Sequence, residues 1–198
     1  MQRVYFTKTQ SCLWQDFFCG RVMNRKTLIM DEMAIGRAMA RITHELIERN
    51  KGATNVCLLG VKTRGIPLTE ILASNIEKFE GVKVPVGYID ITRHRDDISE
   101  SDKKLAGECS FPCDIKDKTV IIVDDVMYTG RTARAAIEAT FAHDRPKELQ
   151  FAVLIDRGHR ELPIRPDYVG KNLPTSKNEI VDVCIKSIDG ETAVYIRG

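Results

Sequence analysis

The most informative segment of the sequence is Val120-Ile121-Ile122-Val123-Asp124-Asp125-Val126-Met127-Tyr128-Thr129-Gly130-Arg131-Thr132. Its β-branched residues predict a buried strand that ends in two carboxylates, and an alanine-rich helix is predicted from Arg131 to His143. In an open parallel sheet, ligands bind beyond the carboxyl ends of the strands, where the first amides of the next helix point at them. The segment therefore predicts an α/β fold with a ligand site at this edge.

The loop after the carboxylates is suited to a phosphate. Gly130 lets the backbone approach closely, and the threonine hydroxyls add donors to the loop amides. The carboxylates suit neutral hydroxyls such as a ribose diol, or a magnesium ion. The alternative, a strand ended by two solvated aspartates, requires the acids, glycine and threonines to coincide by chance. We expect a sugar-phosphate site with contacts from Asp124, Asp125, Val126, Met127, Tyr128, Thr129, Gly130, Arg131 and Thr132.

Length and composition limit the remaining choices. The chain has 198 residues, enough for one well-buried domain, and 43% hydrophobic with 29% charged residues is typical of a soluble protein. No apolar run approaches a membrane-spanning length, so we expect a cytoplasmic protein without a membrane partner. A net charge of +2 does not by itself indicate nucleic-acid binding.

The cysteines do not have the paired spacing of a zinc site. Cys57 and Cys184 lie in apolar runs and are expected to be reduced core residues, as in a cytosolic protein. Cys109 and Cys113 fall in an expected mobile loop, where a disulfide or a bound metal stays open.

Residues 1–22 differ from the rest of the chain. They include Trp14 and two adjacent phenylalanines without a clean period, and Lys8, Asp16 and Arg21 interrupt any signal-peptide core. We interpret them as an extension or a mis-chosen start, with an aromatic interaction arm as the alternative. The predicted domain is residues 23–198.

The first predicted helix begins after Asp31 as its N-cap and runs to about Arg49. An apolar stripe at helical spacing predicts its buried face, made by Ile35, Met39, Ile42 and Leu46. The other side carries Arg37, Arg41, His44 and Arg49. Such a face is usually solvated, and nucleic-acid binding is the alternative.

A second anion site is predicted beside the first. A strand over Asn55–Val61 leads into Lys62-Thr63-Arg64-Gly65, followed by a helix from about Pro67 to Phe79. The basic loop lies at the carboxyl end of a neighbouring strand, where it can contact a diphosphate. The alternative is an ordinary turn with exposed basic tips.

Further strands are predicted over Val82–Ile91, Leu149–Asp156 and Ile180–Ile185, with Ala193–Ile196 closing the sheet. A long charged segment, Thr92–Lys118, is interpreted as a lid whose Arg95 reaches the diphosphate, or else as a solvent loop. A second basic cluster follows Asp156, from Arg157 to Asp167.

From Met23 onward the chain resembles the pyrimidine operon attenuation regulators that are also uracil phosphoribosyltransferases. The resemblance rests on Lys62-Thr63-Arg64-Gly65, on Val120–Thr132, and above all on Asp156-Arg157-Gly158-His159-Arg160-Glu161-Leu162-Pro163-Ile164-Arg165 with Gly170-Lys171-Asn172. It implies a single-domain type I phosphoribosyltransferase fold: a mostly parallel central sheet flanked by helices, with a flexible hood loop.

The resemblance also implies an activity. This is the magnesium-dependent transfer of ribosyl phosphate from phosphoribosyl pyrophosphate to uracil, giving UMP and diphosphate. Thr63 and Arg64 would hold the diphosphate with Arg95 closing over it, and Arg157 with the backbone near Val181 would frame the uracil. The residues expected to carry catalysis are Asp124, Asp125 and Arg64, and the Thr129–Thr132 loop would clamp the 5′-phosphate. The Mg²⁺ ion would be carried by the diphosphate.

The family's second activity is binding a hairpin in the leader mRNA of pyrimidine genes when UMP is bound. By resemblance, a basic face formed across a homodimer or a higher homo-oligomer would use Arg37, Arg41, His44, Arg49, Arg160, Arg165 and Lys171. Gly36 and Ala40 stand where the family often has basic or hydroxyl residues, which weakens this match.

Two other functions stay open. One is a phosphoribosyltransferase that acts only in base salvage, without RNA regulation. The other is transfer to orotate or a purine, which Tyr128 disfavours because purine-specific relatives often carry an acid there and tyrosine is a poor base at neutral pH.

Overall fold

The computed structural model of the protein describes residues 26–95 and 107–198. Within these ranges the main sheet has the strand order β3-β2-β4-β5-β6, and every neighbouring pair is parallel. The predicted parallel sheet is confirmed, with the signature strand β4 at its centre. Its strands are β2 (Val56–Val61), β3 (Val86–Ile89), β4 (Thr119–Met127), β5 (Glu148–Asp156) and β6 (Tyr168–Asn172).

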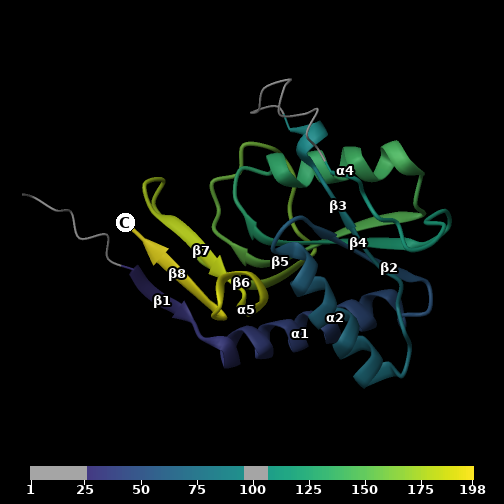
Figure 1. The fold of residues 1–198 in the computed structure, drawn as a ribbon, viewed down its shortest axis with the longest axis horizontal. Coiled ribbons are helices and arrows are strands. Elements are labelled where there is room, and N and C mark those ends of the chain that lie inside the picture. Colours follow the sequence, from purple (N-terminus) through teal and green to yellow (C-terminus); the bar gives the residue numbers. More distant parts are fainter. Residues whose placement is uncertain (1–25, 96–106) are drawn as a thin grey trace, which may run out of the picture.

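Helices cover both faces of this sheet. Helices α1 (Glu32–Asn50) and α2 (Gly65–Glu80) lie on one face and α4 (Arg131–His143) on the other (Figure 1). The predicted N-cap of α1 is confirmed, because the Asp31 carboxylate accepts the Ala34 N–H at 2.7 Å. The predicted apolar stripe of α1 is buried in the core beneath it. The alanines of α4 pack into a separate core on the opposite face.

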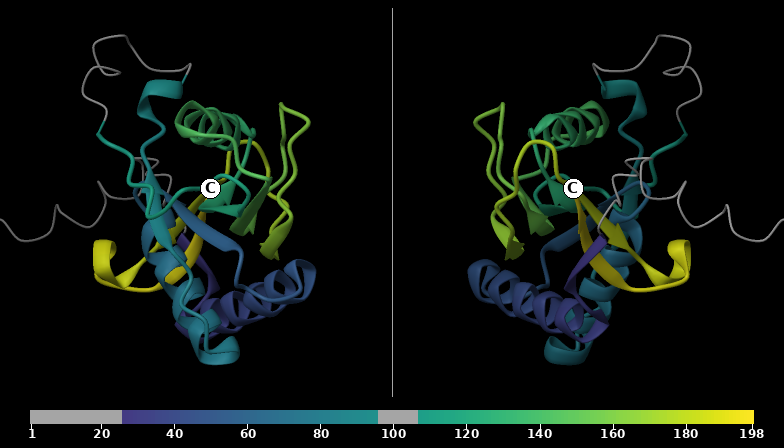
Figure 2. Two further views of the ribbon diagram at one scale, coloured as in Figure 1. Left: turned by 90° about the vertical axis from the view of Figure 1, so that its right-hand side faces the viewer. Right: turned by 90° about the vertical axis from the view of Figure 1, so that its left-hand side faces the viewer.

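A second, smaller sheet stands beside the first. Strands β1 (Lys26–Met30), β8 (Ala193–Arg197) and β7 (Ile180–Cys184) pair antiparallel in that order. The prediction that residues 193–196 close the main sheet is therefore wrong. The short helix α5 (Lys186–Asp189) reverses the chain, so β8 returns along β7 instead of joining β6. Figure 2 shows this sheet, in purple and yellow, from both sides.

The predicted strand over residues 82–91 is shorter in the structure, where only Val86–Ile89 pairs with β2. The turn η1 (Thr92–His94) follows it. Residues 96–106, the middle of the predicted lid, lie outside the described residues. The segment after them packs back onto the domain: Ser110 bridges Tyr88, and Ile115 is fully buried. The end of the predicted charged segment is thus part of the core.

The cysteines in this segment differ from the prediction of a mobile loop. Cys109 and Cys113 are half-buried free thiols that pack against the core under α4. Burial and the neighbouring sulfur of Cys113 raise the pKa of Cys57 to about 12, as expected of an unreactive core thiol.

The remaining predictions concern the N-terminal segment and a possible membrane-spanning helix. The predicted extension, residues 1–22, lies outside the described residues. Among the residues that the structure does describe, no helix has the length and apolar character needed to cross a membrane.

Candidate functional site

Two loops meet at the carboxyl edge of the main sheet. Strands β2 and β4 are parallel neighbours with Gly60 opposite Val123, so the Lys62–Arg64 loop lies beside Asp124 and Asp125. Gly65 permits this contact, because a Cβ there would come within 2.4 Å of the Val123 carbonyl oxygen. Helix α2 begins at Gly65, slightly before the predicted start at about Pro67, which lies in its first turn.

The loop and the carboxylates enclose a small polar cavity of about 210 Å³. It brings together residues that lie far apart in the sequence and that were predicted to contact one ligand. These are Thr63, Arg64, Arg95, Asp124, Asp125, Val126 and Thr132. Cationic and anionic side chains therefore face the same space, as a ligand with both phosphate and hydroxyl groups requires.

A second cavity of about 180 Å³ adjoins the first. Its walls are Arg64 and Asp125 on one side and residues 181–184 of β7 on the other. Val181, which was predicted to help frame the base, lines this second cavity. Because Arg64 and Asp125 line both cavities, one ligand can occupy both.

The pKa values of the paired carboxyls Asp124 and Asp125 are both raised. Burial raises the pKa of Asp124 well above its ordinary value, and the charge of Asp125 raises it further. Burial also raises the pKa of Asp125, although hydrogen bonds and the nearby Arg64 oppose this. Both carboxyls therefore hold their protons to higher pH than an exposed aspartate, and the two groups titrate as a pair.

The predicted phosphate loop leads directly into helix α4. Gly130 has φ of 93° and precedes α4, whose first turn has no side-chain cap. The Arg131 N–H donates a long hydrogen bond, 3.4 Å, to the Thr129 hydroxyl oxygen, and the amides that follow it occupy the helix N-terminus, the position that binds anions. The Arg131 side chain, in contrast, is turned toward Glu161, with Nη2 and Oε2 2.9 Å apart. Glu161 is not among the residues predicted to contact the ligand.

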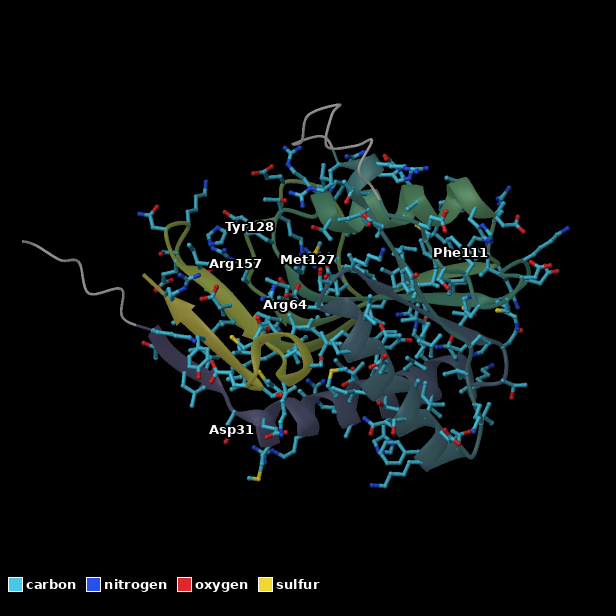
Figure 3. All side chains as sticks on the ribbon, in the orientation of Figure 1. Asp31, Arg64, Phe111, Met127, Tyr128 and Arg157 are labelled. Carbon is cyan, nitrogen blue, oxygen red and sulfur yellow. The ribbon has the colours of Figure 1, made fainter. Side chains whose placement is uncertain are left out.

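Arg157 lies outside both cavities and contacts Tyr128 instead. Its guanidinium carbon is 4.0 Å from the centre of the Tyr128 ring, and it donates to the carbonyl oxygens of Ser176 and Glu179. Figure 3 shows Arg157 and Tyr128 together near Met127. Arg157 is buried and fixes the segment between β6 and β7. The structure thus places Tyr128 against the predicted base-framing arginine.

A carboxylate that sequence analysis missed pairs with Arg64. The carboxylate of Asp189, at the end of α5, accepts hydrogen bonds from Nη2 of Arg64 at 2.9 Å and from Nε at 3.3 Å. No local pattern connects positions so far apart in the sequence, since the pair forms only when the small sheet docks beside β4. A similar pair joins Lys62 and Asp90, 3.6 Å apart.

The cationic residues of the predicted RNA face have different partners. Arg41 donates to the carbonyl oxygens of Val169 and Gly170 and pairs with Glu45, which ties α1 to β6. Arg49 pairs with Asp167 at 2.6 Å. Both arginines therefore lie where α1 meets β6.

The remaining members of that predicted face lie at different places on the domain. His44 stacks on Phe79 of α2, with ring centres 4.4 Å apart, away from β6. Arg160 pairs with Asp156, and Lys171 lies on the neighbouring strand in register with Ile155. Arg37, Arg165 and Lys171 are exposed.

Comparison with known proteins agrees with this fold. The model of the phosphoribosyl transferase domain matches residues 27–188. Two structures of the Trypanosoma cruzi hypoxanthine phosphoribosyltransferase share the fold. The complex with the product IMP has a TM-score of 0.65 at 19% identity, covering 88% of this chain and 90% of that one. The structure from a study of the enzyme's C-terminal region has a TM-score of 0.68 at 20% identity, covering 89% of this chain and 93% of that one. Fold and site define a phosphoribosyltransferase.

Relatives of higher sequence identity define the family within this class. The bifunctional protein PyrR of Clostridium novyi (strain NT) is 55% identical over 175 residues, which are 88% of this chain and 98% of that protein. The PyrR of Clostridium perfringens (strain 13 / Type A) is 56% identical with the same coverage. That of Brevibacillus brevis is 55% identical over 176 residues, again 88% and 98%. The chain belongs to the bifunctional PyrR family of phosphoribosyltransferases.

Proposed function

We propose that the protein is a UMP-responsive RNA-binding regulator of pyrimidine gene attenuation that also converts uracil and phosphoribosyl pyrophosphate to UMP and diphosphate. The observation that carries this proposal is the pair of adjoining cavities that share Arg64 and Asp125. One binds the charged part of a ribosyl donor and the other a small planar base.

The enzymatic roles follow from position. Thr63, Arg64 and Arg95 bind the diphosphate, and the amides at the start of α4 bind the 5′-phosphate. Asp125 accepts a ribose hydroxyl. When diphosphate leaves, positive charge develops on the sugar ring, and the ionised Asp125 beside it lowers the energy of that transition state.

Magnesium fits the donors that are present. Among the described residues there is no cluster of three or more potential metal-binding side chains, whereas Asp124 and Asp125 offer adjacent carboxylate oxygens. Mg²⁺ is typically held by one or two carboxylates together with substrate phosphates. Bound this way, the ion would neutralise charge on the diphosphate.

Regulation has a physical basis in the contact between the phosphate loop and the basic segment after β5. The Thr129 carbonyl oxygen accepts the N–H groups of Glu161 at 2.9 Å and Leu162 at 3.1 Å. This segment carries Arg160 and Arg165, two residues of the proposed RNA face. If UMP favours the RNA-binding arrangement of these loops, RNA must in turn raise the affinity for UMP.

The proposed RNA face extends from α1 across β6 to this segment, and a partner subunit would continue it. All of its residues are exposed, and three of them, Arg41, Arg49 and Arg160, also have structural partners within the domain. The net charge is only +2, so RNA affinity depends on this local grouping.

The first experiment measures binding of the transcript that precedes the organism's own pyrimidine genes, with and without UMP, across a salt series. We expect UMP to tighten binding and the affinity to fall steeply with salt. Absence of binding in both states, with uracil transfer intact, would leave a salvage enzyme only.

A second experiment separates the two activities. Asp125→Asn is expected to abolish uracil transfer, measured by UMP formation, and to leave RNA binding measurable, because Asp125 lies at the cavities and not on the basic face. Full activity in this variant would reject the assigned contact between Asp125 and the ribose.

A further inference from the structure

Arg64 occupies a special position, because its side chain lines both cavities. Asp189 holds this side chain from outside the parallel sheet. The carboxylate accepts from Nε and Nη2, so the outer edge of the guanidinium is engaged by two hydrogen bonds. A guanidinium has five N–H groups. Within residues 26–95 and 107–198, the N–H groups on Nη1 and the second one on Nη2 have no hydrogen-bond partner and are left for an anion.

Asp189 is itself fixed by the backbone. Its Oδ2 accepts the N–H of Ile185 at 2.9 Å, and Ile185 directly follows β7. The strand that forms the wall of the second cavity therefore sets the position of the carboxylate, and the carboxylate sets that of Arg64. The two walls of the second cavity are linked in this way.

We propose that Asp189 is a positioning residue for ribosyl transfer, which holds the Arg64 guanidinium between the two cavities in the orientation that binds the diphosphate. This inference rests on the proposed enzymatic function. Asp189 touches no reacting atom in this arrangement and acts only through Arg64.

The electrostatics are consistent with orientation as its role. The hydrogen bond to Asp189 raises the pKa of Arg64, and the same bond lowers the pKa of Asp189, so both groups are charged at neutral pH. A carboxylate beside the arginine reduces its net attraction for an anion. A benefit to diphosphate binding must therefore come from fixed geometry, which lowers the entropy lost on binding.

The test is Asp189→Asn, which keeps the shape and removes the charge. We expect the KM for phosphoribosyl pyrophosphate to rise about tenfold and kcat to fall, with the KM for uracil changed less. Calorimetric titration with Mg²⁺-diphosphate should show the same weakening without turnover. The matched control is Glu191→Gln, since Glu191 pairs with Lys26 on the same sheet, 3.4 Å apart, and does not line either cavity.

Two outcomes would overturn the inference. Unchanged binding and turnover would make the Arg64–Asp189 pair an ordinary surface ion pair, and tighter diphosphate binding would make Asp189 a competitor of the ligand. Thermal unfolding verifies that each variant is folded.

A double-mutant cycle keeps the inference testable if Asp189→Asn is unstable. In an Arg64→Lys background, Asp189→Ser should have little further effect on diphosphate affinity, because Asp189 acts through the guanidinium. An equal loss in both backgrounds would contradict this. If wild-type protein binds diphosphate and does not transfer to uracil, the proposed function fails while the role of Asp189 is still measured.

Discussion

At the scale of single residues, the buried carboxylates of Asp124 and Asp125 lower the stability of the folded protein. Asp124 is only 6% exposed, and its partners are the backbone and side chain of Asp125, so its burial is not compensated by a cation of its own. Burying a carboxylate beside another costs free energy. Such strain at a cavity is typical of a functional site.

Asp124→Asn should therefore stabilise the free protein by about 1 kcal/mol at neutral pH. The pKa of Asp124 is raised in the folded state, so the folded state holds more protons than the unfolded one between the ordinary and the raised pKa, and the unfolding free energy falls as pH rises. The advantage of the variant should disappear below the ordinary pKa of aspartate. Chemical denaturation from acid to neutral pH measures it.

A pH-independent difference between Asp124→Asn and the wild type would contradict this origin. The backbone hydrogen bond from Asp125 N to Asp124 Oδ1, 2.9 Å long, survives in the variant because an amide oxygen also accepts it. Binding of phosphoribosyl pyrophosphate, measured in parallel, should weaken.

At the scale of elements, the phosphate loop and the segment after β5 are in direct contact. Arg131 and Glu161 join them by an exposed ion pair, and the Thr129 carbonyl joins them by two backbone hydrogen bonds. An exposed ion pair contributes little to stability. Its effect should therefore appear in coupling rather than in folding.

Glu161→Gln is expected to leave thermal stability nearly unchanged and to reduce the factor by which UMP tightens RNA binding by about threefold. Titration of RNA with and without UMP gives this factor. Glu138→Gln, which breaks the Arg134–Glu138 pair on α4, serves as a control. Equal coupling in all three proteins would remove the ion pair from the regulatory contact.

The residues of the proposed RNA face are of two kinds, which substitution should separate. Arg41→Gln removes hydrogen bonds between α1 and the edge strand β6 and should cost about 1 kcal/mol of stability besides weakening RNA binding. Arg165→Gln should spare stability and uracil transfer and reduce the salt slope of RNA binding. Denaturation and RNA titration test both. A stable Arg41→Gln protein would contradict the structural role.

Sequence patterns predicted the elements whose burial is local and periodic. The α1 stripe, the β2 and β4 strands and the phosphate loop were predicted because the pattern that identifies each of them lies within a short stretch of sequence. Strands β1 and β6 were not, since β6 contains Gly170, Lys171 and Asn172, and is strand only by pairing with β5. The pair of Arg64 with Asp189 was missed for the same reason: it depends on contacts between distant segments.

At the scale of the whole molecule, the fold does not specify the base. The hypoxanthine phosphoribosyltransferases share this fold at about a fifth sequence identity, which carries no information on substrate choice. Tyr128, which the sequence predicts to disfavour a purine, stands beside Arg157 and lines neither cavity.

We expect hypoxanthine and guanine not to compete with uracil at concentrations tenfold above the uracil KM, because Tyr128 offers no carboxylate to a purine at neutral pH. Inhibition of UMP formation measures this. Efficient purine transfer would show that the base cavity is set by residues other than Tyr128.

The small sheet has a consequence for how the chain can be connected. Strands β1 and β8 are antiparallel neighbours with Lys26 opposite Arg197, so the first and last strands of the described domain end side by side (Figure 1). A tight turn of a few residues would join them into a ring. The ring could be reopened at Asp144–Arg145, beyond α4 and away from both cavities. A circularly permuted gene of this kind should encode an active enzyme.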